Sequence, residues 1–159
     1  MIPLYAVLVL SAEGGHSVAA AILFGAAGAT DQIDGFLARR WHVESRFGQI
    51  ADPLADRLLI DVAVVLLWHA DRLPWIALLV PARDLALILA TPLAIRRGYR
   101  FEVNMLGKIA TWFLYASLFF VTLTPADTDW PLVVFWAGFA LALASLVAYV
   151  LKARREVRA

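Results

Sequence analysis

Hydrophobic residues in this chain occur in long runs that are separated by short polar breaks. Five of the runs span 21 to 23 positions, and a helix needs about 20 apolar residues to cross a bilayer. In lipid, backbone hydrogen bonds must be satisfied within each segment, so such runs are typical of membrane-spanning helices. The five predicted spans are 18–38, 48–68, 73–95, 104–124 and 130–150.

The first hydrophobic run, 2–10, is too short to cross a bilayer by itself. We therefore expect a first helix that is short or truncated, followed by the five full-length spans. The predicted fold class is an all-α integral membrane protein, a bundle of six transmembrane helices. At this length we expect a single domain over residues 1–159.

Basic residues are concentrated in alternate connections between the predicted spans. They are Arg39, Arg40 and Arg46 after the first full span, Arg96, Arg97 and Arg100 after the third, and Lys152, Arg154, Arg155 and Arg158 in the tail. The positive-inside rule places these segments in the cytoplasm. With six helices, both termini are then cytoplasmic. We expect a multi-pass protein of the cell membrane whose active site faces the cytoplasm.

The overall composition agrees with a membrane protein. Hydrophobic residues make up 62% of the chain and charged residues 17%, whereas soluble domains are about one quarter charged. The net charge of +1 gives no reason to expect a nucleic-acid partner, and none is predicted. The absence of cysteine excludes disulfides, thiolate metal sites and cysteine nucleophiles.

Four aspartates stand out because charge is otherwise scarce in this hydrophobic chain. Asp31 and Asp34 fall within about 100° of arc on one predicted helix, and Asp52 and Asp56 are four residues apart on the next. The connection between the two helices is short, so we expect them to be antiparallel neighbours. The four carboxylates are then predicted to converge on one cavity near the cytoplasmic side.

Four carboxylates in one cavity repel one another unless a cation compensates them. Neither stripe carries His or Cys, and oxygen ligands alone suit a hard ion such as Mg²⁺ or Mn²⁺. Four carboxylates could bridge two such ions, an arrangement that clamps a phosphoryl group during in-line displacement. Gly35, Ala38 and Gly48 share these faces and would let a ligand approach the backbone closely. Structural helix packing is the alternative, but four intramembrane carboxylates favour a functional site.

These residues belong to a longer pattern, D-x2-D-G-x2-A-R-x8-G-x3-D-x3-D, in which every position is filled. The pattern resembles the signature of the CDP-alcohol phosphatidyltransferase family. It reads here as Asp31, Asp34, Gly35, Ala38, Arg39, Gly48, Asp52 and Asp56. Weaker similarity continues at Gly107, Lys108, Thr111, Ser145 and Tyr149. Family members usually carry an Asn or Thr and an Arg in the first helix, upstream of where this chain begins, so we expect a clipped start.

The resemblance implies transfer of a phosphatidyl group from CDP-diacylglycerol to an alcohol, with release of CMP. It implies that two metal ions, Mg²⁺ or Mn²⁺, are held by Asp31, Asp34, Asp52 and Asp56. It also implies that Asp56 is the general base for the acceptor hydroxyl. The CDP moiety of the donor would be bound by Asp34, Gly35, Ala38, Arg39 and Gly48. The family further implies a homodimer surrounded by membrane lipids.

Two basic residues are candidates for binding the acceptor. Lys108 matches the Gly-Lys element of the family, although a helix-end lysine that snorkels to the interface is an alternative. Arg83 lies at a similar predicted depth to Asp61, so it forms either a structural ion pair with Asp61 or a contact with the acceptor. Neighbours in a helix point about 100° apart, so we expect Arg83 to be poorly placed to pair with Asp84.

The identity of the acceptor is left open by these residues. A glycerol-type alcohol is implied, with glycerol 3-phosphate favoured, as in phosphatidylglycerophosphate synthases. The segment "ARDLALILATPLAIRRG" also resembles an actinobacterial branch with cardiolipin synthase activity, in which phosphatidylglycerol is the acceptor. A hypothesis of a different class is a divalent-cation or proton carrier whose buried carboxylates bind the transported ion.

Overall fold

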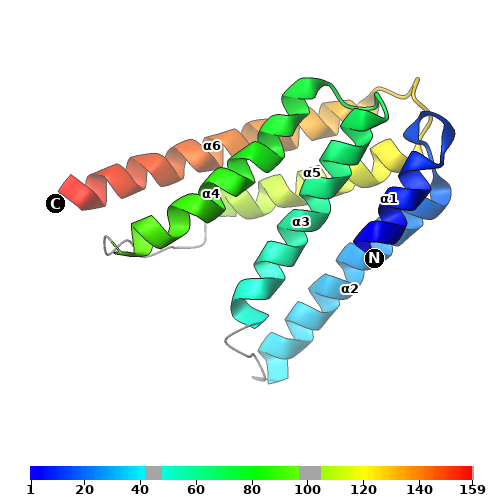
Figure 1. Cartoon of the computed structure of the whole chain (residues 1–159). Coiled ribbons are helices and arrows are strands. Elements are labelled where there is room, and N and C mark those ends of the chain that lie inside the picture. Colours follow the sequence, from blue (N-terminus) through cyan, green and yellow to red (C-terminus); the bar gives the residue numbers. More distant parts are fainter. Residues whose placement is uncertain (42–47, 97–104, 159) are drawn as a thin grey trace.

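The computed structural model describes secondary structure for residues 1–41, 48–96 and 105–158. Side chains are described for 1–12, 14–30, 33, 57–89, 105–149 and 151. Within these ranges all regular secondary structure is helical (Figure 1). The α helices are α1 (Ile2–Leu10), α2 (Val18–Trp41), α3 (Gly48–His69), α4 (Leu79–Arg96), α5 (Met105–Leu123) and α6 (Trp130–Arg158), with short 3₁₀ helices η1 (Glu13–Gly15) and η2 (Trp75–Leu78).

The helices agree closely with the hydrophobic runs, and the largest differences have local causes. α4 begins later than the predicted span because Pro74, with an extended ψ of 158°, precedes the 3₁₀ turn of η2. α6 extends eight residues beyond the predicted end at Val150, to Arg158. The added segment is rich in Lys, Arg and Glu, which are good helix formers although they are not apolar. Hydropathy therefore predicted the apolar length of this helix and not its full length.

The helices are arranged around an antiparallel pair formed by α5 and α6 (Figure 1). α2 packs against α5, and α3 contacts α1, α4 and α5. The short helix α1 lies against both α2 and α3, and α2 and α3 also contact each other. The predicted neighbours that carry the four aspartates are thus adjacent helices.

Aromatic side chains from α1, α2 and α5 form part of the buried core. The Phe24 ring stacks on the Tyr115 ring, with the two ring centroids 4.5 Å apart. The ring centroids of Phe24 and Tyr5 are 5.3 Å apart. The Tyr5 and Thr122 hydroxyl oxygens are 3.0 Å apart and form a buried hydrogen bond. This bond connects α1 to α5 and satisfies two hydroxyl groups that burial would otherwise penalise. Short as it is, α1 is an integrated part of the bundle.

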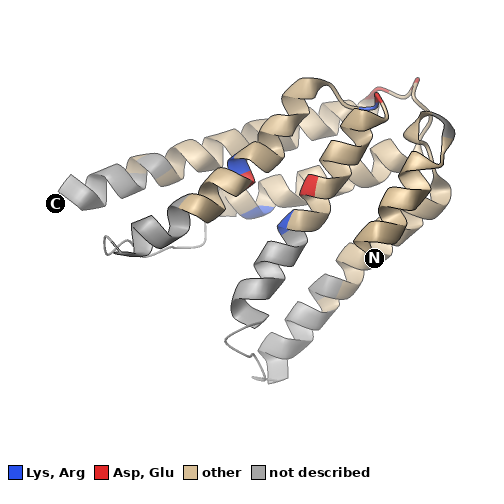
Figure 2. Cartoon of the chain, viewed as in Figure 1, with Lys and Arg blue, Asp and Glu red and all other residues tan. Residues whose placement is uncertain are grey.

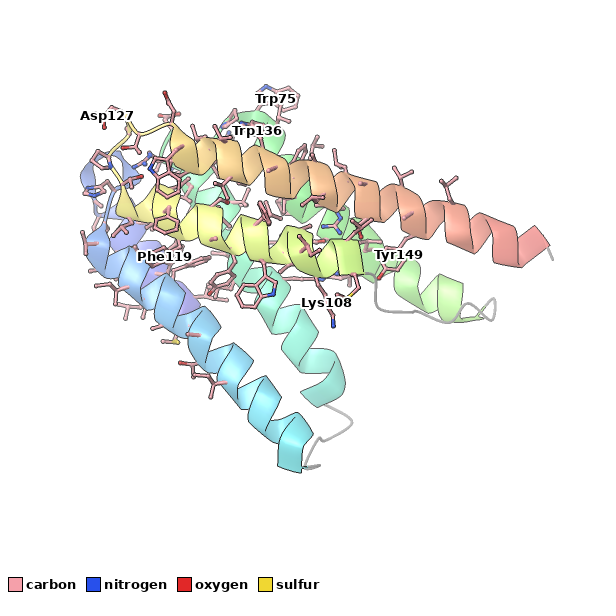
Figure 3. All side chains as sticks on the ribbon, turned by 180° about the vertical axis from the view of Figure 1, so that it is seen from behind. Trp75, Lys108, Phe119, Asp127, Trp136 and Tyr149 are labelled. Carbon is pink, nitrogen blue, oxygen red and sulfur yellow. The ribbon has the colours of Figure 1, made fainter. Side chains whose placement is uncertain are left out.

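Two glycines in α2 allow the aromatic residues of α5 to approach its backbone. A Cβ atom placed on Gly25 would lie 2.9 Å from Phe119, which is labelled in Figure 3. A Cβ atom on Gly28 would overlap the Tyr115 ring and hydroxyl. In the space that Gly28 leaves, Tyr115 Oη donates a 2.7 Å hydrogen bond to the carbonyl oxygen of Phe24. Small residues at helix crossings serve this purpose in membrane bundles.

Replacing Gly28 by Ala should therefore destabilise the protein by about 1–3 kcal/mol, because overpacking outweighs the better helix propensity of alanine. The measurement is thermal unfolding of the purified protein in detergent. Gly107→Ala is the comparison variant and should cause a smaller change, since its Cβ would meet a single atom, Ser145 Oγ, at 3.1 Å. An equal change in both variants would contradict the role assigned to Gly28.

The surface of the described residues is that expected in an apolar solvent. α5 and the Trp130–Tyr149 part of α6 are each long and apolar enough to cross a membrane, and only 33% and 28% of these residues are buried. The core helix of a soluble protein would be mostly buried. Charged side chains are sparse along the described part of the other helices as well (Figure 2). The structure is thus consistent with a membrane protein.

Candidate functional site

The predicted site residues lie on the two helices where the sequence placed them. Asp31 and Asp34 fall within α2, and Asp52 and Asp56 fall within α3, so each pair is separated by about one turn of continuous helix. The side chains of the motif residues are not among those that the structure describes. These residues are Asp31, Asp34, Gly35, Ala38, Arg39, Gly48, Asp52 and Asp56. Their convergence on one cavity therefore stays a prediction.

The metal site also stays a prediction. Among the side chains that the structure describes, no group of three or more His, Cys, Asp or Glu could hold a metal ion. The donor set of the motif is chemically suitable, because it offers carboxylate oxygens only, on two helices that contact each other. These residues are the ones that would hold hard divalent cations.

A charged cluster connects α3 to α4 just beyond the aspartate motif. Figure 2 shows the positions of charged residues along both helices. Arg57 follows Asp56 directly, and its Nη1 donates to Asp84 Oδ1 at 2.8 Å. Nη1 of Arg83 lies 3.3 Å from the same oxygen. The Asp84 side chain is 6% exposed and that of Arg83 is 10% exposed. One buried carboxylate oxygen therefore receives two guanidinium groups from two helices.

This cluster corrects two expectations about Arg83. The expected ion pair between Arg83 and Asp61 does not form, and Arg83 pairs instead with Asp84, its neighbour in the helix. Neighbouring positions in a helix point about 100° apart, but the long Arg83 side chain bends back far enough to bring its Nη1 to 3.3 Å from Asp84 Oδ1. Asp61 Oδ1 and Arg83 Nε are buried and have no hydrogen-bond partner among the described residues.

The Gly-Lys element lies at the beginning of α5, as the sequence predicted. Lys108 is exposed, and Figure 3 shows it at the same end of the α5–α6 pair as Tyr149. Thr111 Oγ1 donates to the carbonyl oxygen of Gly107 at 2.9 Å. Gly107 also allows Ser145 of α6 to approach closely. The element thus has a packing role between α5 and α6, and binding of an acceptor by Lys108 stays a prediction.

A second polar network, at the C-terminal end of α5, was missed by the sequence analysis. Nη2 of Arg72 donates to three carbonyl oxygens, those of Val121 and Thr124 at 2.7 Å and that of Pro125 at 3.3 Å. Nη1 of Arg72 donates to the carbonyl oxygen of Gly14 at 3.3 Å. The last carbonyls of a helix have no partner within it, and a cation there also interacts favourably with the helix dipole.

The carbonyl groups between these positions are satisfied by the segment before α2. The Ser17 amide donates to the Thr122 carbonyl oxygen at 3.0 Å. His16 Nε2 lies 2.8 Å from the Leu123 carbonyl oxygen, so this nitrogen carries the donated proton. Desolvation lowers the pKa of Arg72, although an arginine keeps its charge at neutral pH. The network thus joins the connections between α1 and α2, between α3 and η2, and between α5 and α6, at the end of the bundle away from Lys108.

Comparisons with known proteins identify the family. The sequence model for the CDP-alcohol phosphatidyltransferase family matches residues 1–149. A CDP-diacylglycerol–glycerol-3-phosphate 3-phosphatidyltransferase of Bacillus subtilis is 38% identical over 96 residues, which cover 60% of this chain and 50% of that protein. A cardiolipin synthase (CMP-forming) of Streptomyces coelicolor is 36% identical over 171 residues, covering 99% of this chain and 79% of that protein.

A third relative is a probable phosphatidylglycerophosphate synthase of Mycobacterium tuberculosis, 31% identical over 99% of this chain and 78% of that protein. The chain thus spans from half to about four fifths of the length of these relatives. The similarity confirms the predicted family and enzyme class, and it gives no support to the alternative of an ion carrier. The chain belongs to the CDP-alcohol phosphatidyltransferase family.

Proposed function

We propose that this protein transfers a phosphatidyl group from CDP-diacylglycerol to a glycerol-type alcohol and releases CMP, as a step of phospholipid biosynthesis. Glycerol 3-phosphate is the favoured acceptor. The proposal is carried by one observation: the complete aspartate motif lies on two contacting helices of a chain that the family model matches over residues 1–149.

The proposed roles follow from the chemistry of the motif. Asp31, Asp34 and Asp52 hold two divalent cations, and Asp56 completes the second site. When bound, the cations neutralise the diphosphate of the donor and the charge that leaves with CMP. Asp56 accepts the proton of the acceptor hydroxyl, which makes that oxygen a better nucleophile. Arg39 contacts the donor diphosphate.

The donor nucleotide requires space beside these carboxylates. Gly35, Ala38 and Gly48 have little or no side chain, so cytidine can approach the helix backbones there. Lys108 and Arg83 are the proposed contacts of the acceptor. Their positive charge suits an acceptor that carries a phosphate group, since carboxylate and phosphate oxygens are the partners that these side chains prefer.

One comparison supports an alternative acceptor. The Streptomyces coelicolor relative, named as a cardiolipin synthase, is similar over 99% of this chain. Phosphatidylglycerol, which also presents a glycerol hydroxyl and a phosphate group, is therefore the alternative acceptor.

The proposed membrane arrangement follows from the distribution of basic residues. We propose that the chain forms one domain of six membrane helices in the cell membrane, with both termini and the aspartates on the cytoplasmic side. The apolar surfaces of α5 and α6 support a membrane location. A homodimer is proposed by analogy with the family.

Purified protein should release CMP from CDP-diacylglycerol only when an acceptor and Mg²⁺ or Mn²⁺ are present. Chelation with EDTA should stop the reaction, and added metal should restore it, because the donor diphosphate is then compensated again. The measurement is CMP release with glycerol 3-phosphate or phosphatidylglycerol offered separately, with identification of the lipid product.

Formation of phosphatidylglycerophosphate alone supports the favoured acceptor, and formation of cardiolipin alone replaces it by the alternative. Protein that releases no CMP with either acceptor, but moves metal ions across vesicle membranes, would contradict the proposed reaction.

A further inference from the structure

We infer that Asp84 is a positioning residue for the proposed reaction: it aligns Arg57 and Arg83, and so holds α3 at Asp56 in register with α4. The inference rests on the proposed function. It goes beyond the family motif, since Asp84 lies in α4, outside that pattern.

The geometry places one atom at the centre of the cluster. Asp84 Oδ1 accepts from Arg57 Nη1 at 2.8 Å, which connects α4 to α3. The same oxygen lies 3.3 Å from Arg83 Nη1 within α4. Asp84 is almost completely buried, so little water competes for this oxygen. The position of both guanidinium groups therefore depends on one carboxylate.

The contact to Arg57 acts directly beside the proposed general base. Arg57 and Asp56 are consecutive in α3, so a bond that fixes one residue restrains the backbone of the other. The Arg57 side chain is 39% exposed and would be free to turn toward solvent without Asp84. Misplacement of a reacting group by about 1 Å can reduce a rate about 100-fold. Asp84 thus restrains the backbone of α3 beside Asp56, on whose position the proposed proton transfer depends.

Stability alone is a poor explanation of the cluster. Buried ion pairs contribute little net stability, because desolvation offsets their attraction. A network selected for stability would also satisfy its buried polar atoms, yet Nε of Arg83 has no hydrogen-bond partner among the described residues. Costly ionisable groups among membrane helices are usually retained for function. These observations favour alignment of the site.

The test compares steady-state kinetics of Asp84→Asn, Asp84→Glu and wild type, per amount of folded enzyme. With Asp84→Asn, kcat/KM for the acceptor should fall about 100-fold. KM for CDP-diacylglycerol should change by less than about threefold, because donor binding is not removed. Asp84→Glu keeps the carboxylate, so its kcat/KM for the acceptor should be at least about tenfold higher than that of Asp84→Asn. Asp127→Asn, in the exposed turn labelled in Figure 3, is the matched control and should behave as wild type.

A double-mutant cycle with Arg57→Gln separates alignment from general damage. If Asp84 acts through Arg57, the double variant should be no less active than the weaker single variant. Independent, multiplying effects would overturn the inference, as would an Asp84→Asn enzyme whose kcat/KM stays within about threefold of wild type. If Asp84→Asn does not fold, Arg57→Gln and Arg57→Lys provide the test. Arg57→Gln should lower kcat/KM for the acceptor about 10-fold or more, and Arg57→Lys should lower it by about half as much on a logarithmic scale. Activity equal to wild type in both variants would overturn the inference.

The outcome also separates this inference from the proposed function. A wild-type enzyme that releases CMP while the Asp84 variants match it would leave the function intact and remove the inference alone. A wild-type enzyme without turnover on either acceptor would overturn the proposed function, and the inference with it.

Discussion

Replacing Asp56 by Asn should reduce CMP release by about 1,000-fold or more, because an amide can neither accept the acceptor proton nor serve as an anionic metal ligand. Asn has nearly the same shape as Asp, so α3 should form normally. The measurement is single-turnover CMP release with saturating acceptor and Mg²⁺. Thermal unfolding of the same preparation establishes that the protein is folded.

Asp127→Asn is again the appropriate control, since the same chemical change occurs at an exposed position in the turn between α5 and α6. It should leave the rate unchanged. If Asp56→Asn keeps more than about a tenth of the wild-type rate, Asp56 is not the general base, since removal of a base costs about 100-fold or more. The proposed metal ligands would then be reduced to Asp31, Asp34 and Asp52.

Replacing Arg72 by Met should give the largest loss of stability among the variants considered. The buried guanidinium donates four hydrogen bonds to backbone carbonyl oxygens, and methionine fills a similar volume without donating any. Hydrogen bonds that involve a charged group are each worth about 1.5–3 kcal/mol, and they are not additive. We expect a total loss of about 3–5 kcal/mol, measured as a drop of roughly 10 °C in the unfolding temperature in detergent.

The neighbouring residue provides a matched control. Asp71 is exposed and has a positive φ of 56°, a conformation that Asn tolerates, so Asp71→Asn should change stability by less than about 0.5 kcal/mol. Arg72→Lys should be intermediate, because an ammonium group keeps the charge but loses the planar fork of donors. Equal stability of Arg72→Met and wild type would show that water replaces the guanidinium at these carbonyl oxygens.

Much of the helical framework could be predicted from hydrophobic run lengths. The predicted span 104–124 agrees with α5 to within one residue at each end, and the short run 2–10 is α1 itself. The agreement is good because helix formation in an apolar solvent is determined by local sequence. The start of α4 and the end of α6 were less accurate. The proline turn before α4 leaves the hydropathy high although α4 has not begun, and the polar tail of α6 lowers the hydropathy although the helix continues.

The site was predictable in its residue types and less so in its contacts. The angle of about 100° between neighbouring positions predicted that Asp84 would not pair with Arg83. In the structure, both Arg57 and Arg83 contact the Asp84 carboxylate. The long-range partner, Arg57, is 27 positions away in the chain. No spacing rule within one helix could have identified that contact.

Residue types and their spacing were enough to predict the helical class, most of the helix boundaries, the aspartate motif and the family, because each depends on one helix or on two adjacent helices. Which charged groups meet could be seen only in the folded protein. No sequence pattern assigned a role to Arg72, which became apparent only when the segment before α2 and the end of α5 were seen around it. The same holds for Asp84, whose partner lies on another helix. Such contacts depend on distances between elements and on side-chain conformations, and neither is encoded in a periodic pattern.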